Sequence, residues 1–132
     1  MVSPRIAGSM KGLSPADVER VNGFMERVIR AFEVADPNAL QEMEHPGGDP
    51  RGTRNTFEFN KSLMGGGDKV RSWSAQPYSE PDWEIMEILR FQPPPTIWIE
   101  VTLHDGKREY PLAFACLADE EGFLRSCYYV DR

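Results

Sequence analysis

The chain has 132 residues, which is the size of one domain with a single hydrophobic core. Its 21 acidic and 15 basic residues give a formal net charge of -6, and no basic run is interleaved with aromatic residues, so nucleic acid is not expected as a partner. No stretch approaches the ~18 apolar residues of a membrane span, and the first eighteen residues lack the apolar core of a signal peptide. We therefore expect a cytoplasmic protein without membrane contact.

The first part of the chain predicts an arm followed by a helix. Residues 1–13 contain few apolar side chains, and we expect them to form a mobile N-terminal arm, with one domain over residues 14–132. Ser14-Pro15-Ala16-Asp17 has the features of a helix start, namely a hydroxyl cap, a proline at the first helical position and an acid in the first turn. Apolar residues then recur at helical spacing and predict a helix through about Ala35.

A second, shorter helix is expected after Asp36-Pro37, with Ala39, Leu40 and Met43 as its apolar positions. The region from 49 to 82 is harder to interpret. Residues 56–64 favour a helix, although Phe57-Glu58-Phe59 alternates like a strand. We expect a short helical segment from Asp68 to Trp73, and a loop over 74–82 because of its prolines.

The C-terminal part of the chain predicts an antiparallel meander of four strands, at residues 83–91, 96–104, 108–118 and 122–131. Asp105-Gly106 is typical of a two-residue hairpin turn, which would place His104 opposite Lys107 and Val101 opposite Tyr110. An even-length turn after Ala118 would place Tyr110 opposite Asp131.

Alternation along these strands separates two faces of the sheet. The expected inner face is mostly apolar and consists of Ile97, Ile99, Val101, Tyr110, Leu112, Phe114, Cys116, Arg125, Cys127, Tyr129 and Asp131. The outer face includes Trp98, Glu100 and Tyr128. Cys116 and Cys127 are interpreted as two buried free thiols, with a disulfide as the alternative.

The order of elements resembles a known superfamily. Helices at the front and a meander at the end resemble the cone-shaped α+β fold of the nuclear transport factor 2-like superfamily, also described as cystatin-like, which includes ketosteroid isomerases and polyketide cyclases. The resemblance spans roughly residues 14–132 and rests on this pattern, on the Ala35-Asp36-Pro37-Asn38-Ala39-Leu40 junction and on Asp49-Pro50-Arg51-Gly52.

The resemblance implies a curved sheet that encloses a pocket with the helices. Ile99, Val101, Leu112, Phe114 and Cys127 would line this pocket, and the outer face with Trp98 and Tyr128 would form a homodimer. Asp49 lies near the place of the isomerases' general base. Phe114 stands where those enzymes have an oxyanion-stabilising acid and Val28 where they have a tyrosine, so steroid isomerisation is not expected.

Polar groups on the inner face suggest a candidate site. Tyr110, Tyr129 and Asp131 could orient a substrate, with Asp131 as base and a phenol as donor; alternatively, the tyrosines are core residues and Asp131 is solvated. A single Glu-x-x-His spacing at Glu42 to His45 is too little for a di-metal bundle, so no metal site is expected.

Two classes of function remain open. One is a small-molecule-binding protein or cofactor-independent enzyme, with a mainly apolar pocket for a small apolar or aromatic ligand and proton-transfer chemistry of the isomerase, dehydratase or cyclase kind. The other is a non-catalytic dimeric module that binds a protein or sequesters a ligand. An isolated aspartate or tyrosine in a deep cavity would favour the enzyme.

Overall fold

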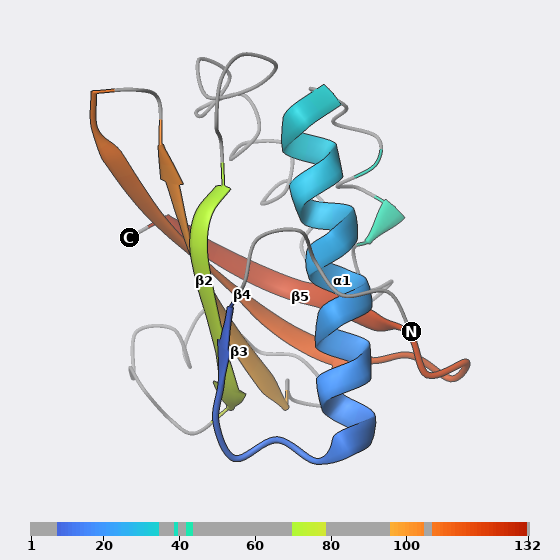
Figure 1. The fold of residues 1–132 in the computed structure, drawn as a ribbon. Coiled ribbons are helices and arrows are strands. Elements are labelled where there is room, and N and C mark those ends of the chain that lie inside the picture. Colours follow the sequence, from blue (N-terminus) through green and yellow to red (C-terminus); the bar gives the residue numbers. More distant parts are fainter. Residues whose placement is uncertain are drawn as a thin grey trace.

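The computed structural model describes residues 8–34, 39, 42–43, 70–78, 96–104 and 107–131, with the backbone alone described for 126–131. It contains the helix α1 (Pro15–Val34) and the strands β1 (Ser9–Met10), β2 (Val70–Pro77), β3 (Ile97–His104), β4 (Glu109–Ala118) and β5 (Leu124–Asp131). The strands form one sheet in the order β1-β2-β3-β4-β5, and α1 lies across one face of it (Figure 1). The expected α+β class is confirmed.

Helix α1 begins where its capping residues predict. Ser14 Oγ accepts a hydrogen bond from the amide of Asp17 at 3.2 Å, which satisfies one of the unpaired donors of the first turn. Pro15 is the first helical residue, and the helix continues through Val34. The prediction of a helix from this cap to about Ala35 is therefore confirmed to within one residue.

The apolar stripe of α1 packs on the sheet and forms the core. Its buried apolar residues are Val21, Phe24, Met25, Val28, Ile29, Ala31 and Phe32. They share one cluster with the apolar side chains of β2, β3, β4 and the start of β5. The rings of Phe24 and Phe114 meet edge to face, with centroids 5.4 Å apart, which is a preferred aromatic geometry. The inner face of the sheet is thus the face that the helix covers.

The register between β3 and β4 differs from the prediction by two residues. Val101 is opposite Leu112, Ile99 is opposite Phe114, and His104 is opposite Glu109. The connection therefore spans residues 105–108 rather than the Asp-Gly pair alone. Because side chains alternate with a period of two, a shift of two residues leaves each side chain on its expected face.

The pairing of β4 with β5 also corrects the prediction. Phe114 is opposite Tyr129 and Leu112 is opposite Asp131, so Tyr110 and Asp131 are not a pair. The register then shifts between Ala115 and Cys116, because Cys127 is an extra residue on β5. This bulge places Leu124 on the core side, where it is buried, so the assignment of Arg125 to the inner face was wrong.

Strand β2 was not predicted. Residues 70–73 were expected to be helical and 74–77 to lie in a loop, whereas Val70–Pro77 is a strand antiparallel to β3. Its buried positions are Val70, Trp73 and Ala75, and a register shift between Val70 and Ser72 interrupts the alternation. An irregular strand of this kind lacks the period-two pattern that sequence interpretation depends on.

Part of the expected arm is held against β2. Ser9 and Met10 pair in parallel with Ser74 and Ala75, and the amide of Lys11 donates to the carbonyl of Ala75 at 3.2 Å. A Cβ at Gly8 would lie 2.1 Å from the ring of Trp73, so only glycine permits this approach.

Several predictions lie outside the described residues. They concern the strand at 83–91, the helix at 56–64 and most of the second helix. Ala39 and Glu42, which are described, have helical backbone, and Met43 is buried in the core.

Candidate binding pocket

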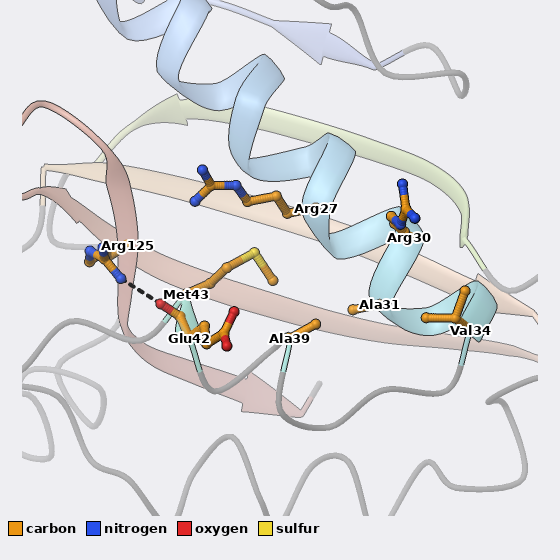
Figure 2. A pocket seen from close by; sticks show the side chains of 8 residues that line it. All are labelled: Arg27, Arg30, Ala31, Val34, Ala39, Glu42, Met43 and Arg125. Carbon is orange, nitrogen blue, oxygen red and sulfur yellow. Dashed lines mark hydrogen bonds between the residues drawn. The ribbon is translucent and has the colours of Figure 1, made fainter.

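A pocket of about 660 Å³ lies between the second half of α1, the residues Ala39, Glu42 and Met43, and the start of β5 (Figure 2). The described residues that line it are Arg27, Arg30, Ala31, Val34, Ala39, Glu42, Met43 and Arg125. Half of these side chains are apolar and half are charged. The pocket therefore combines a surface for an apolar group with several charged groups.

Helix α1 contributes four of these residues at helical spacing. Arg27, Arg30, Ala31 and Val34 follow the i, i+3, i+4, i+7 pattern of one helix face, next to the buried stripe. Ala31 is buried, whereas Val34 is 59% exposed. One flank of the helix thus forms the pocket wall while the neighbouring stripe holds the core.

The opposite wall includes Ala39, Glu42 and Met43. Met43 is buried in the same cluster as the α1 side chains, and Ala39 is half-buried against this cluster. A methionine has a flexible and polarisable side chain that adapts to irregular ligand surfaces. The apolar part of the pocket is therefore continuous with the core.

Arg125 connects the pocket walls to the β4–β5 turn. Its Nε donates to Asp119 Oδ2 at 2.6 Å, and its Nη1 donates to the backbone carbonyl of Glu42. A cation at the exposed carbonyl of a helical segment is favourable, because such carbonyls carry partial negative charge. Arg125 thus links Glu42 to β5.

Asp119 organises the turn that positions Arg125. Its Oδ1 accepts hydrogen bonds from the amides of Glu121 and Phe123, both at 2.9 Å, and Gly122 adopts a positive φ of 88° in the turn. The hydrogen bond from Arg125 lowers the pKa of the Asp119 carboxyl below its ordinary value of 3.8; the two backbone hydrogen bonds act in the same direction, and desolvation opposes them. The carboxylate is therefore ionised near neutral pH.

A second pocket, of about 390 Å³, adjoins the first along α1. It is lined by Ala16, Glu19, Arg20, Gly23, Phe24, Arg27, Glu121, Gly122, Phe123 and Leu124. Arg27 belongs to both pockets, and its guanidinium lies 5.2 Å from the ring centroid of Phe123, which is 45% exposed. Arg20 Nε donates to the Gly122 carbonyl at 3.1 Å and fixes this part of the helix to the turn.

The residues expected to line a ligand pocket lie elsewhere. Ile99, Val101, Leu112 and Phe114 are buried in the core cluster and line neither of these two pockets, and Tyr110 packs on the margin of the cluster. Cys116 is buried in the core, as predicted. The backbones of Cys127, Tyr129 and Asp131 belong to β5, but their side chains, like all of Asp49, lie outside the described residues.

The outer face of the sheet also differs from expectation at Trp98. Its side chain is only 2% exposed within a single chain, and its Nε1 donates to Glu100 Oε1 at 3.1 Å. The rings of Trp98 and Tyr78 lie 6.1 Å apart. Trp98 is thus packed inside the chain, and a homodimer through this face stays a prediction.

Neither Arg27 nor Arg30 was assigned to a site from the sequence. One signal could have identified them: they share one helix face with Ala31 and Val34. A second signal was Met43 in the expected second helix, because an apolar side chain of this size is usually buried against a neighbouring element. What the sequence could not supply was the contact between Glu42 and β5, which is the hydrogen bond from Arg125 to the Glu42 carbonyl.

Within the described ranges, no three side chains of His, Cys, Asp and Glu gather as a metal site would require. No helix in this part of the chain is long and apolar enough to cross a membrane. Comparisons of the chain with protein-family models, with curated proteins and with solved structures found no match.

Proposed function

We propose that this protein binds a small molecule in the pocket that α1 and β5 form with Ala39, Glu42 and Met43. The observation that supports this most directly is a pocket of about 660 Å³ whose apolar side chains adjoin three guanidinium groups. Ligand pockets typically have volumes of roughly 300–1,000 Å³ and combine apolar walls with a few polar groups that orient the ligand. The lining side chains fit that description, with more charge than the mainly apolar pocket expected from the sequence.

Binding fits this pocket better than proton-transfer catalysis. A general acid–base mechanism needs a titratable group held within reach of the reacting atoms. Among the described lining residues, Glu42 is the one carboxylate and its side chain is exposed, and no histidine, tyrosine or cysteine is present. Isomerase, dehydratase or cyclase chemistry would therefore need residues outside this set.

We also propose a more specific assignment of the fold than the α+β class. We infer a cone of the nuclear transport factor 2-like kind, and it is supported by one long helix that precedes and covers an antiparallel β3-β4-β5 meander. Backbone chemical shifts and cross-strand nuclear Overhauser effects would test it, because the cone requires residues 83–91 to form a further strand of the curved sheet. Helical shifts over 83–91 would contradict it.

A neutral fluorescent probe can test the binding function. N-phenyl-1-naphthylamine is apolar and increases its fluorescence when it leaves water, so we expect saturable binding of one molecule per chain. Ala39→Phe places a ring in the pocket and should abolish this binding. Ala16→Phe makes the same substitution at an exposed residue of the second pocket and should leave it unchanged.

Circular dichroism and thermal melting would establish that both variants fold. If Ala39→Phe folds and still binds the probe as the wild type does, the pocket is not the binding site and the proposed function falls. If Ala16→Phe alone prevents binding, the second pocket is the site instead.

A further inference from the structure

The charge of the pocket is opposite to that of the protein. The chain carries a formal net charge of -6, yet three arginines and one glutamate line this pocket among the described residues. A local excess of cations in an acidic protein produces a site that attracts anions, while the rest of the surface repels them. The arrangement of the guanidiniums therefore indicates the class of ligand.

Two of the three guanidiniums are held in place by other side chains. The Arg27 guanidinium lies over the Phe123 ring, with Cζ 5.2 Å from the ring centroid, and this cation–π contact uses none of its N–H groups for a hydrogen bond to an acceptor atom. Arg125 uses its Nε and one Nη1 hydrogen for Asp119 and Glu42, so its Nη2 donors remain. Both cations are thus positioned before a ligand arrives, which reduces the entropy lost on binding.

The charged and the apolar lining residues lie toward different ends of the pocket. Figure 2 shows Arg27 and Arg125 toward one end, near Met43, whereas Ala31, Ala39 and Val34 lie toward the other end, where α1 finishes. Arg30 points away from Met43 in the same view. A ligand with a charged group at one end and an apolar body at the other would match this arrangement.

We propose that the pocket selects an amphipathic organic anion, whose acidic group contacts Arg27 and Arg125 and whose apolar body lies along Ala31, Val34 and Ala39. This inference rests on the proposed function and specifies its ligand class. The shared chemistry is a carboxylate, sulfonate or phosphate group attached to a hydrocarbon or aromatic body. Planar guanidinium groups suit such oxyanions because they donate paired, charge-assisted hydrogen bonds.

Glu42 opposes this selectivity. Its exposed carboxylate lines the same pocket, and Figure 2 shows it between the arginine end and Ala39. Repulsion from Glu42 should weaken the binding of any anion. Removing this charge should therefore strengthen anion binding, whereas removing the charge of Arg27 should weaken it. Arg71 offers a charge-matched control, because it pairs with Glu109 at the surface on β2, and both side chains are more than half exposed.

The decisive experiment compares two probes that share an aromatic body. 8-Anilinonaphthalene-1-sulfonate carries a sulfonate, and N-phenyl-1-naphthylamine lacks it. We expect the sulfonate to bind at least about tenfold more tightly at low salt, with the preference reduced at high ionic strength. Arg27→Gln should weaken the sulfonate roughly tenfold and the neutral probe little, because a charge-assisted hydrogen bond is lost. Glu42→Gln should tighten the sulfonate a few-fold, and Arg71→Gln should change neither probe.

A role for Phe123 in positioning Arg27 has its own test. Phe123→Leu should weaken the sulfonate a few-fold in the wild-type background and have no further effect in Arg27→Gln, because the ring acts only through the guanidinium. Equal losses in both backgrounds would show that Phe123 contacts the ligand directly.

The outcomes separate the two proposals. If Ala39→Phe blocks both probes but the sulfonate binds no more tightly than the neutral probe, the proposed function holds and the anion preference is wrong. If Arg27→Gln and Arg71→Gln weaken sulfonate binding equally, the effect comes from the overall charge of the protein. The proposed contact between Arg27 and the acidic group is then wrong. If neither probe binds, both proposals fall. If the sulfonate does bind more tightly than the neutral probe, competition by alkyl phosphates and by alkyl carboxylates of equal chain length would show which kind of acidic group the pocket prefers.

Discussion

Nε of Arg125 lies 2.6 Å from Oδ2 of Asp119, and this ion pair joins the pocket to the turn between β4 and β5. The same guanidinium reaches the backbone carbonyl of Glu42, far away in the sequence. One side chain therefore connects the helical residue Glu42 with the edge strand of the described sheet. The shape of the pocket depends on this connection.

The first prediction concerns the pH dependence of stability. Because the pKa of Asp119 is lowered on folding, its contribution is fully present above the unfolded-state value near 3.8 and is lost as the pH falls through the folded-state pKa. Asp119→Asn should therefore be less stable than the wild type at pH 6, and the difference should shrink at pH 2.5. Urea unfolding at the two pH values measures this. An equal difference at both would show that the charge of Asp119 is not what stabilises the turn.

A second prediction concerns Gly23 in the middle of α1. A Cβ at this position would meet no heavy atom within 4 Å, and glycine destabilises a helix interior relative to alanine. Gly23→Ala should raise the free energy of unfolding by roughly 0.5–1 kcal/mol. Gly122→Ala is the contrasting variant, because its φ of 88° is left-handed and a side chain there should destabilise the protein by roughly 1–2 kcal/mol. Destabilisation by Gly23→Ala would mean that the helix needs space at this position.

A third prediction concerns Trp98. Since its side chain is buried within one chain, Trp98→Ala should lower the free energy of unfolding by roughly 3–5 kcal/mol, and Trp98→Phe should cost much less. Chemical denaturation at several protein concentrations measures both this loss and any contribution of a homodimer. A marginal loss in Trp98→Ala that grows with protein concentration would show that the residue serves an interface and not the fold.

A fourth prediction concerns the attachment of β1. A side chain at Gly8 would overlap the ring of Trp73, so Gly8→Val should displace β1 from β2. Hydrogen exchange at the Lys11 amide reports this directly, because that amide is bonded to the Ala75 carbonyl. Ser9→Ala, which changes an exposed side chain of the same strand, should leave the exchange rate unaltered. Unchanged protection in Gly8→Val would contradict the close approach to Trp73.

Local signals in the sequence predicted a large part of the fold. The cap at Ser14 and the spacing of the apolar residues located α1, and alternation located β3, β4 and most of β5, because these signals depend on neighbouring residues alone. The inner and outer faces of β3 and β4 were also predicted correctly. This succeeded although the register was wrong, because the error of two residues preserves the alternation.

What the sequence could not provide depends on contacts between distant segments. Cys127 forms a bulge that reverses the faces of Arg125 and Leu124, and no local pattern marks it. Strand β2 was missed because its own bulge hides the alternation of Val70 and Trp73. The pocket was missed for a related reason, since it requires α1 and β5 to meet Ala39, Glu42 and Met43.

The position of a bound probe tests the binding proposal. Nuclear Overhauser effects between the aromatic protons of 8-anilinonaphthalene-1-sulfonate and the protein's methyl groups would locate it. The binding proposal predicts effects at the ε-methyl of Met43 and the methyls of Val34, both of which line the pocket. Effects confined to Ile99, Val101 and Leu112, which are buried between the helix and the sheet, would instead place the ligand beneath α1 and contradict it.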